Sequence, residues 1–140
     1  MDVVANGLWK PFQTTYFDVR VFHPNSASYL KTPIERLYRM NEAAKNQAYG
    51  RRVREVEGGS FTPLVMSTSG GMGKEFEKTL RRMASRVTMR AEEKYSQVIN
   101  HLRTRLRFAL LRACLIALRG ERKKITPFVV AGLADTEYLD

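Results

Sequence analysis

Two aspartates near the start of the chain could bind a divalent cation if the fold brings them together. Asp2 and Asp18 have 15 residues between them. Magnesium prefers oxygen ligands, typically one or two carboxylates plus water and substrate phosphate, and it activates water for phosphodiester hydrolysis. The pair therefore predicts a Mg²⁺ cofactor at Asp2 and Asp18. As an isolated feature, such a pair more often has no shared role.

Three further residues could complete a catalytic group. Arg20 lies two residues beyond Asp18 and could stabilise charge, although a guanidinium does not readily lose a proton and so is a poor base. Lys45 and Tyr49 lie one helical turn apart and could add a second cation and a contact to phosphate or water. The candidate catalytic residues are Asp2, Asp18, Arg20, Lys45 and Tyr49.

The residues around Asp18 alternate as in a β-strand. Thr14–Phe22 is rich in β-branched and aromatic residues, with Asp18 and Arg20 on one face and Phe17 on the other. The simpler interpretation is a solvent-facing strand that carries a cross-strand ion pair. The alternative is half of a metal-dependent nuclease site.

A hairpin would bring the two aspartates together. Residues 1–5 are typical of a short strand, Asn6-Gly7 is a turn signal, and Lys10-Pro11 breaks any strand between them. Folding the chain near Lys10 places Asp2 roughly opposite residues 17–18.

The remaining pattern favours an α/β domain. Thr32-Pro33-Ile34-Glu35 predicts a helix with a capping box, in which Thr32 is the N-cap and Glu35 lies at N3. A buried strand is expected over 61–67, with Pro63 near a sheet edge or at the strand start. Strand, strand, helix, strand, helix, helix is the order expected of a small mixed sheet with helices packed on it.

Two long helices form the C-terminal half. The first runs from Lys74 to about Glu93 and the second from about Tyr95 to Arg119, with much of the C-terminal half of the second expected to be buried. Its expected core stripe is Val98, Leu102, Leu106, Ala109, Ala113 and Ile116. One α/β domain over residues 1–120, with a basic helical half at 74–120, is therefore predicted, followed by a loose tail at 121–140.

Positive charge is concentrated in this helical half. The chain has a net charge of +10; residues 1–73 carry 9 Lys/Arg against 6 Asp/Glu, residues 74–124 carry 15 against 5, and the tail is acidic. This concentration of positive charge indicates that the helices bind a polyanion, with nucleic acid (DNA or RNA) as the partner. A solvated surface is the simpler alternative. The expected nucleic-acid-binding residues are Lys74, Lys78, Arg81, Arg82, Arg86 and Arg90.

Ser69-Gly70-Gly71-Met72-Gly73 stands at the junction between the third strand and the next helix. Its backbone N–H groups could bind phosphate, although a hinge is the commoner role. It is not a Walker A loop, because Glu75 follows Lys74 where Ser or Thr would be needed.

Cysteine use and apolar runs limit the class of protein. A lone Cys114 excludes a disulfide framework and a multi-cysteine zinc site, and it is expected to be a buried small apolar residue. No apolar run is long enough to span a membrane and no signal peptide opens the chain, so no membrane partner is expected. A reducing compartment fits, and the nucleus or cytoplasm is the expected location.

The aspartate spacing, the Asp18-Val19-Arg20-Val21 run and the following helix and apolar strand resemble the PD-(D/E)XK restriction-endonuclease-like nucleases. Residues 2–25 and 51–73 also resemble a segment of retroelement-derived, reverse-transcriptase-associated proteins and the endonuclease of non-LTR retrotransposons. The resemblance covers about residues 2–120. Met1 replaces a usual proline and Arg20 a usual lysine, and the family's first helix and strand are missing, which implies an N-terminally truncated domain.

Three functions remain open. The resemblance implies a metal-dependent DNA endonuclease that hydrolyses phosphodiesters at Asp2 and Asp18. The second is a catalytically inactive remnant that binds nucleic acid through the basic helices. The third is a helical interaction module whose charge is incidental.

Overall fold

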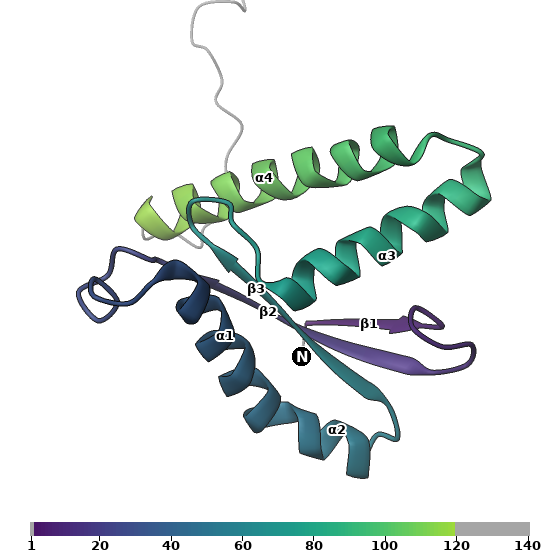
Figure 1. Cartoon of the computed structure of the whole chain (residues 1–140), viewed down its shortest axis with the longest axis horizontal. Coiled ribbons are helices and arrows are strands. Elements are labelled where there is room, and N and C mark those ends of the chain that lie inside the picture. Colours follow the sequence, from purple (N-terminus) through teal and green to yellow (C-terminus); the bar gives the residue numbers. More distant parts are fainter. Residues whose placement is uncertain (1, 120–140) are drawn as a thin grey trace, which may run out of the picture.

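A computed structural model describes residues 2–119 of the chain, and a three-stranded mixed sheet lies at their centre (Figure 1). Strand β1 (Val3–Asn6) pairs antiparallel with β2 (Thr14–Phe22), and β2 pairs in parallel with β3 (Ser60–Ser67). The strand order is β1-β2-β3. The predicted α/β class with a small mixed sheet is confirmed, as is the placement of Pro63 on an edge strand.

Helices cover both faces of the sheet, and their order is the one predicted. On one face α1 (Ile34–Lys45) continues into a π-helical turn, η1 (Asn46–Gly50), and then into α2 (Arg51–Glu55). On the other face lie α3 (Lys74–Ala91) and the long α4 (Tyr95–Arg119) (Figure 1). None of the described helices is both long and apolar enough to cross a membrane.

The alternation of β2 assigns each of its faces to one helical layer. Phe17 packs with residues of β3, α3 and α4, including Leu64, Phe76 and Leu110. Phe22 points the other way and packs with Tyr38 and Leu37 of α1, with Val65 of β3 and with Tyr29. The expected division of β2 into two faces is therefore confirmed, and Asp18 lies on the α1 face.

The start of α1 differs from the prediction. Pro33, not Thr32, occupies the N-cap position, with φ −55° and ψ 139°, and no side chain caps the helix. The Pro33 carbonyl accepts the first helical hydrogen bonds, from Arg36 and Leu37. Thr32 lies one residue too early, because its backbone N–H already bonds to the carbonyl of Tyr29. The prediction of a capping box formed by Thr32 and Glu35 is therefore wrong.

The end of α4 also differs from the prediction. The helix packs through Val98, Ile99 and Leu110, with Leu106 and Cys114 partly buried. A row on its outer side is exposed in the described structure: Phe108, Leu111, Leu115, Ile116 and Leu118; Ala109 and Ala113 are exposed as well. One narrow stripe of the helix suffices for the contact with α3 and the sheet, and residues 2–119 provide no second layer. The expected burial of much of this half is therefore wrong, and Cys114 is partly rather than fully buried; the tail at 121–140 lies outside the described residues.

Candidate functional site

The register between β1 and β2 places Asp2 across from Asp18. Val3 pairs with Phe17 in the antiparallel ladder, and the backbone N–H of Asp2 donates to the carbonyl of Phe17 at 2.9 Å. Directly opposed residues of such a pair present their side chains on the same face. The expectation that the hairpin would bring these two backbone positions together is confirmed.

Asp18 is buried under α1 and forms an ion pair with a lysine. Its side chain is 8 % exposed, and its Oδ2 pairs with the Nζ atom of Lys45, the last residue of α1, which is 19 % exposed. A buried carboxylate needs such a partner, because it has lost the solvation of water. The interpretation of a solvent-facing cross-strand pair is therefore wrong: the face is covered, and the cation comes from a helix.

Asp2 uses its side chain to extend the sheet. Its Oδ2 accepts the backbone N–H of Val19 at 2.9 Å. The backbone ladder of β1 begins at Val3, so the carboxylate satisfies an edge N–H of β2 that β1 does not reach. This contact fixes the Asp2 carboxylate at the exposed end of β1, one residue along β2 from Asp18.

Arg20 shares the α1 face of β2 with Asp18 and is half-buried. Within residues 2–119 its guanidinium makes no ion pair, whereas the ammonium of Lys45 does pair with Asp18. The structure thus places Arg20 near the predicted group without joining it to a carboxylate.

Tyr49 lies one turn beyond Lys45, in η1, and contacts it. The Nζ atom of Lys45 is 5.4 Å from the centroid of the Tyr49 ring, a cation–π distance. On its other side the Tyr49 ring lies 5.7 Å from the ring of Phe61 in β3. Asp18, Lys45 and Tyr49 therefore form one continuous group, with Asp2 next to it.

A magnesium ion that takes its other ligands from water and phosphate needs one or two carboxylates from the protein, the number that Asp2 and Asp18 could supply. The bond from Val19 engages only Oδ2 of Asp2, and Lys45 lies beside Asp18. No group of three or more His, Cys, Asp or Glu side chains is clustered within residues 2–119. A metal that needs three acidic ligands from this part of the chain does not fit.

Two of the predicted nucleic-acid-binding arginines hold the loop that follows β1. The Nε atom of Arg82 donates to the carbonyl of Leu8 at 3.0 Å, and Arg86 donates to the carbonyl of Gly7 at 2.6 Å. Both arginines belong to α3, so they join this helix to the β1–β2 connection. At least part of their role is therefore to anchor this loop, which is neither nucleic-acid binding nor the solvated surface of the simpler alternative.

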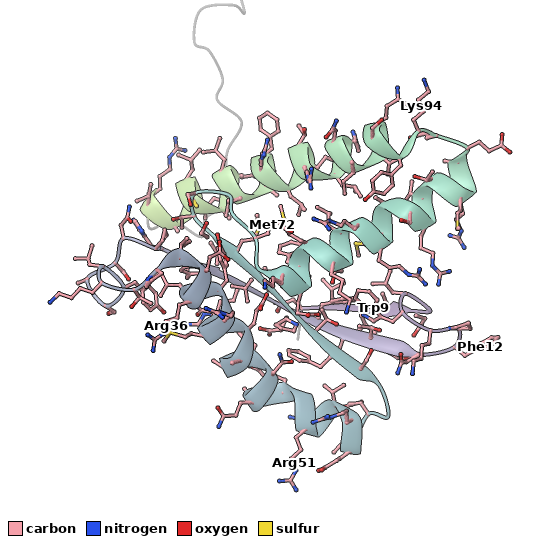
Figure 2. All side chains as sticks on the ribbon, viewed as in Figure 1. Trp9, Phe12, Arg36, Arg51, Met72 and Lys94 are labelled. Atoms are coloured by element: carbon pink, nitrogen blue, oxygen red, sulfur yellow. The ribbon has the colours of Figure 1, made fainter. Side chains whose placement is uncertain are left out.

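Other cations of α3 have partners too. The ammonium of Lys78 lies 5.2 Å from the ring centroid of Trp9, which lies beside α3 (Figure 2). Arg81 pairs with Glu77 at 3.3 Å, an exposed pair that contributes little to stability. Within residues 2–119, the predicted binding residues whose side chains make no hydrogen bond, ion pair or cation–π contact are Lys74 and Arg90.

The N–H groups of the Ser69–Gly73 loop are already bonded within the protein. Gly70 donates to the carbonyl of Ser67 at 3.0 Å, Gly71 to the Ser67 hydroxyl at 3.1 Å, and Gly73 to the carbonyl of Val65 at 2.9 Å. These three N–H groups are therefore not free to bind phosphate. The suggestion that the loop binds phosphate through its backbone is wrong for these three residues.

Sequence reasoning missed Glu42, a buried carboxyl on α1. Its Oε1 accepts the backbone N–H of Glu75 at 3.1 Å and so caps the N-terminus of α3. Burial raises the pKa of Glu42, while the hydrogen bond from Glu75 acts in the opposite direction. A Cβ atom at residue 73 would lie 2.2 Å from this oxygen, so Gly73 makes room for it. The sequence offered one signal for this role: Glu42 lies in the predicted helix, directly after Asn41 and one turn after Tyr38.

Comparisons with family models, with curated proteins and with solved structures found no match to this chain. The geometry of the described residues is therefore what supports a function.

Proposed function

We propose that the chain carries a magnesium-dependent endonuclease site on a restriction-endonuclease-like core, of the kind found in retroelement-derived proteins. The observation that carries the proposal is the buried ion pair between Asp18 and Lys45, with Asp2 across from Asp18 on the neighbouring strand. Two carboxylates and a lysine on one sheet face are the residue types that phosphodiester hydrolysis needs.

Each residue has a distinct task in this proposal. Asp2 and Asp18 hold the ion, and Mg²⁺ when bound supplies an activated water and stabilises charge on the leaving oxygen. Lys45 pairs with the Asp18 carboxylate and places positive charge beside the scissile phosphate. The Tyr49 ring steadies the ammonium of Lys45, and Arg20 offers a second cation on the same face.

Nicking of supercoiled plasmid tests the proposal. We expect wild-type protein to nick DNA with Mg²⁺ and not with EDTA, and Asp18→Asn to lower the rate by at least about 100-fold. Glu55→Gln is the matched control, because this acidic side chain is exposed on α2, where it pairs with Arg51. Equal nicking by wild type and Asp18→Asn, or no nicking by wild type, would contradict the proposal.

Asp2→Asn separates the catalytic from the structural task of Asp2. The amide oxygen of asparagine can still accept the N–H of Val19, so stability should change by less than about 0.5 kcal/mol. The negative charge that a metal needs is lost, so the nicking rate should fall as for Asp18→Asn. A loss of nicking in Asp2→Ala alone, with Asp2→Asn fully active, would assign Asp2 a structural role only.

A second candidate is nucleic-acid binding without cleavage. It is favoured by the exposed cations Lys74 and Arg90 of α3 and by exposed arginines of α4, Arg105, Arg107 and Arg112. In EDTA, this function predicts DNA or RNA affinity that falls linearly on a log–log plot against salt concentration. Affinity that is unaffected by salt would contradict it.

A further inference from the structure

A cavity of about 450 Å³ lies beside the proposed site, where β2 and β3 begin. Its walls come from the residue before β2, from η1, from α2 and from the start of β3. Four polar side chains and one aromatic ring line it, and its other two residues are glycines: Gln13, Asn46, Arg54, Ser60 and Phe61 are the five with side chains. None of these lining residues is acidic.

Two of the polar groups are held in place by neighbouring atoms. The Nε atom of Arg54 donates to the carbonyl of Gly50 at 3.2 Å, which leaves the terminal nitrogens of the guanidinium for another partner. The hydroxyl of Ser60 shares a 2.8 Å hydrogen bond with the hydroxyl of Thr15. The cavity therefore presents fixed donors and acceptors, which is what recognition of a polar planar molecule requires.

Ring contacts join this cavity to the carboxylates. Phe61 lines the cavity and lies 5.7 Å from the ring of Tyr49. Tyr49 in turn lies under the ammonium of Lys45, which pairs with Asp18. Tyr49 and Lys45 thus connect Phe61, in the wall of the cavity, to Asp18. The π-helical turn supplies both Tyr49 and Asn46, and such turns are frequent at functional sites.

We propose that this cavity binds one nucleobase of a nucleic-acid strand whose phosphate lies at Asp2 and Asp18, an inference that rests on the proposed function. Phe61 offers a ring on which a base can stack, as in single-strand binding sites. The side-chain amides of Gln13 and Asn46 offer paired donors and acceptors of the kind that read base edges. Arg54 stacks on the base or contacts its phosphate.

A lone inorganic anion fits this cavity less well. It would use Arg54 and leave the two amides and the Phe61 ring without a partner. A cation fits less well still, because no lining residue is acidic. The mixture of one ring, two amides and one guanidinium matches a base with its phosphate.

Abasic scanning of a single-stranded oligonucleotide of about 12 nucleotides tests this inference. Binding is measured by fluorescence anisotropy in EDTA, so that no cleavage is required. For wild type, removal of the base at one position should weaken binding by about 10-fold, while other positions matter less. Phe61→Leu and Asn46→Ala should bind the intact strand more weakly and lose the sensitivity at that position.

Gln47→Ala is the matched control, because Gln47 is the next residue of η1 and does not line the cavity. It should retain the wild-type abasic profile, and thermal unfolding of each variant confirms its fold. An arm with AMP distinguishes a base within a strand from a free nucleotide: competition as strong as that of the oligonucleotide would assign the cavity to a free nucleotide.

The inference is overturned by a flat abasic profile, by a profile that Phe61→Leu leaves unchanged, or by no binding of either oligonucleotide or AMP. The abasic profile is measured in EDTA, where the metal-dependent nicking does not take place. A failure of nicking and a failure of base binding are therefore separate results.

Discussion

The Nζ atom of Lys45, at the end of α1, forms an ion pair with Oδ2 of Asp18 in the middle of β2. The pair fastens the helix to the sheet at the point where the proposed chemistry takes place. It therefore contributes both to stability and to the site, and the two contributions can be separated by mutation.

Lys45→Met should destabilise the protein by roughly 3 kcal/mol, because it removes the Lys45 ammonium from the buried Asp18 carboxylate. Urea unfolding measures the change. The double variant Asp18→Asn/Lys45→Met should lie within about 1 kcal/mol of wild type, since no buried charge remains. If the double variant were as unstable as Lys45→Met, packing and not charge would explain the loss.

Gly71→Ala should destabilise the protein by about 2 kcal/mol, because its Cβ would lie 2.0 Å from the hydroxyl oxygen of Tyr38. That hydroxyl donates to Ser67 at 2.9 Å and cannot move away freely. Gly50→Ala is the matched control: φ there is −61°, and the nearest atom to its Cβ would be 3.9 Å away. This control should be neutral or more stable by up to about 1 kcal/mol, and thermal unfolding compares the two.

Stability should depend on pH through Glu42. Burial raises its pKa above the ordinary value of 4.5, so the folded state binds this proton more tightly than the unfolded state. The contribution of Glu42 is therefore fully present below pH 4.5 and is lost as pH rises through the raised pKa. Glu42→Gln keeps an acceptor for the N–H of Glu75 and has no proton to lose.

The free energy of unfolding of Glu42→Gln, relative to wild type, should therefore increase from pH 4 toward neutrality, a range that starts near the unshifted pKa. Urea titrations at several pH values measure it. A difference that is constant or that shrinks over this range would show that the raised pKa of Glu42 does not govern stability.

Arg82 and Arg90 of α3 should respond differently to truncation. Arg82→Ala removes the hydrogen bond to the carbonyl of Leu8 and should cost about 1.5 kcal/mol of stability. Arg90→Ala should change stability by less than about 0.5 kcal/mol and weaken DNA binding with a shallower salt dependence. Equal effects of both variants on stability would show that the contact of Arg82 with the loop contributes nothing.

Local patterns predicted most of the elements. Strand β2 and helix α4 have the expected bounds, because period-two alternation and a long apolar stripe depend only on neighbouring residues. The meeting of Asp2 with β2 followed from one turn signal and chain geometry. The contact between Lys45 and Tyr49 followed from helical spacing, although its continuation into a π-helical turn left no mark in the pattern.

The wrong predictions share one cause. In each, the outcome depends on which distant residues contact the side chain or backbone group in question. The predicted N-cap of α1 was wrong because Thr32 belongs to the preceding turn, where its backbone N–H donates to the carbonyl of Tyr29. The outer face of α4 has no neighbour within residues 2–119, although its composition matches that of a buried helix. The partners of Arg82, Arg86 and Glu42 lie between 33 and 79 residues away along the chain, and no local pattern encodes contacts of that range.

The cap that Glu42 provides has a consequence for the order of folding. Glu42 and Glu75 are 33 residues apart and belong to helices on opposite faces of the sheet. The backbone N–H of Glu75 therefore finds its acceptor only after α1 has docked on the sheet. Closing the chain between Glu42 and Glu75 costs conformational entropy before this hydrogen bond can form. We expect this turn to form after the folding transition state, so that Glu42→Ala accelerates unfolding and leaves the folding rate nearly unchanged.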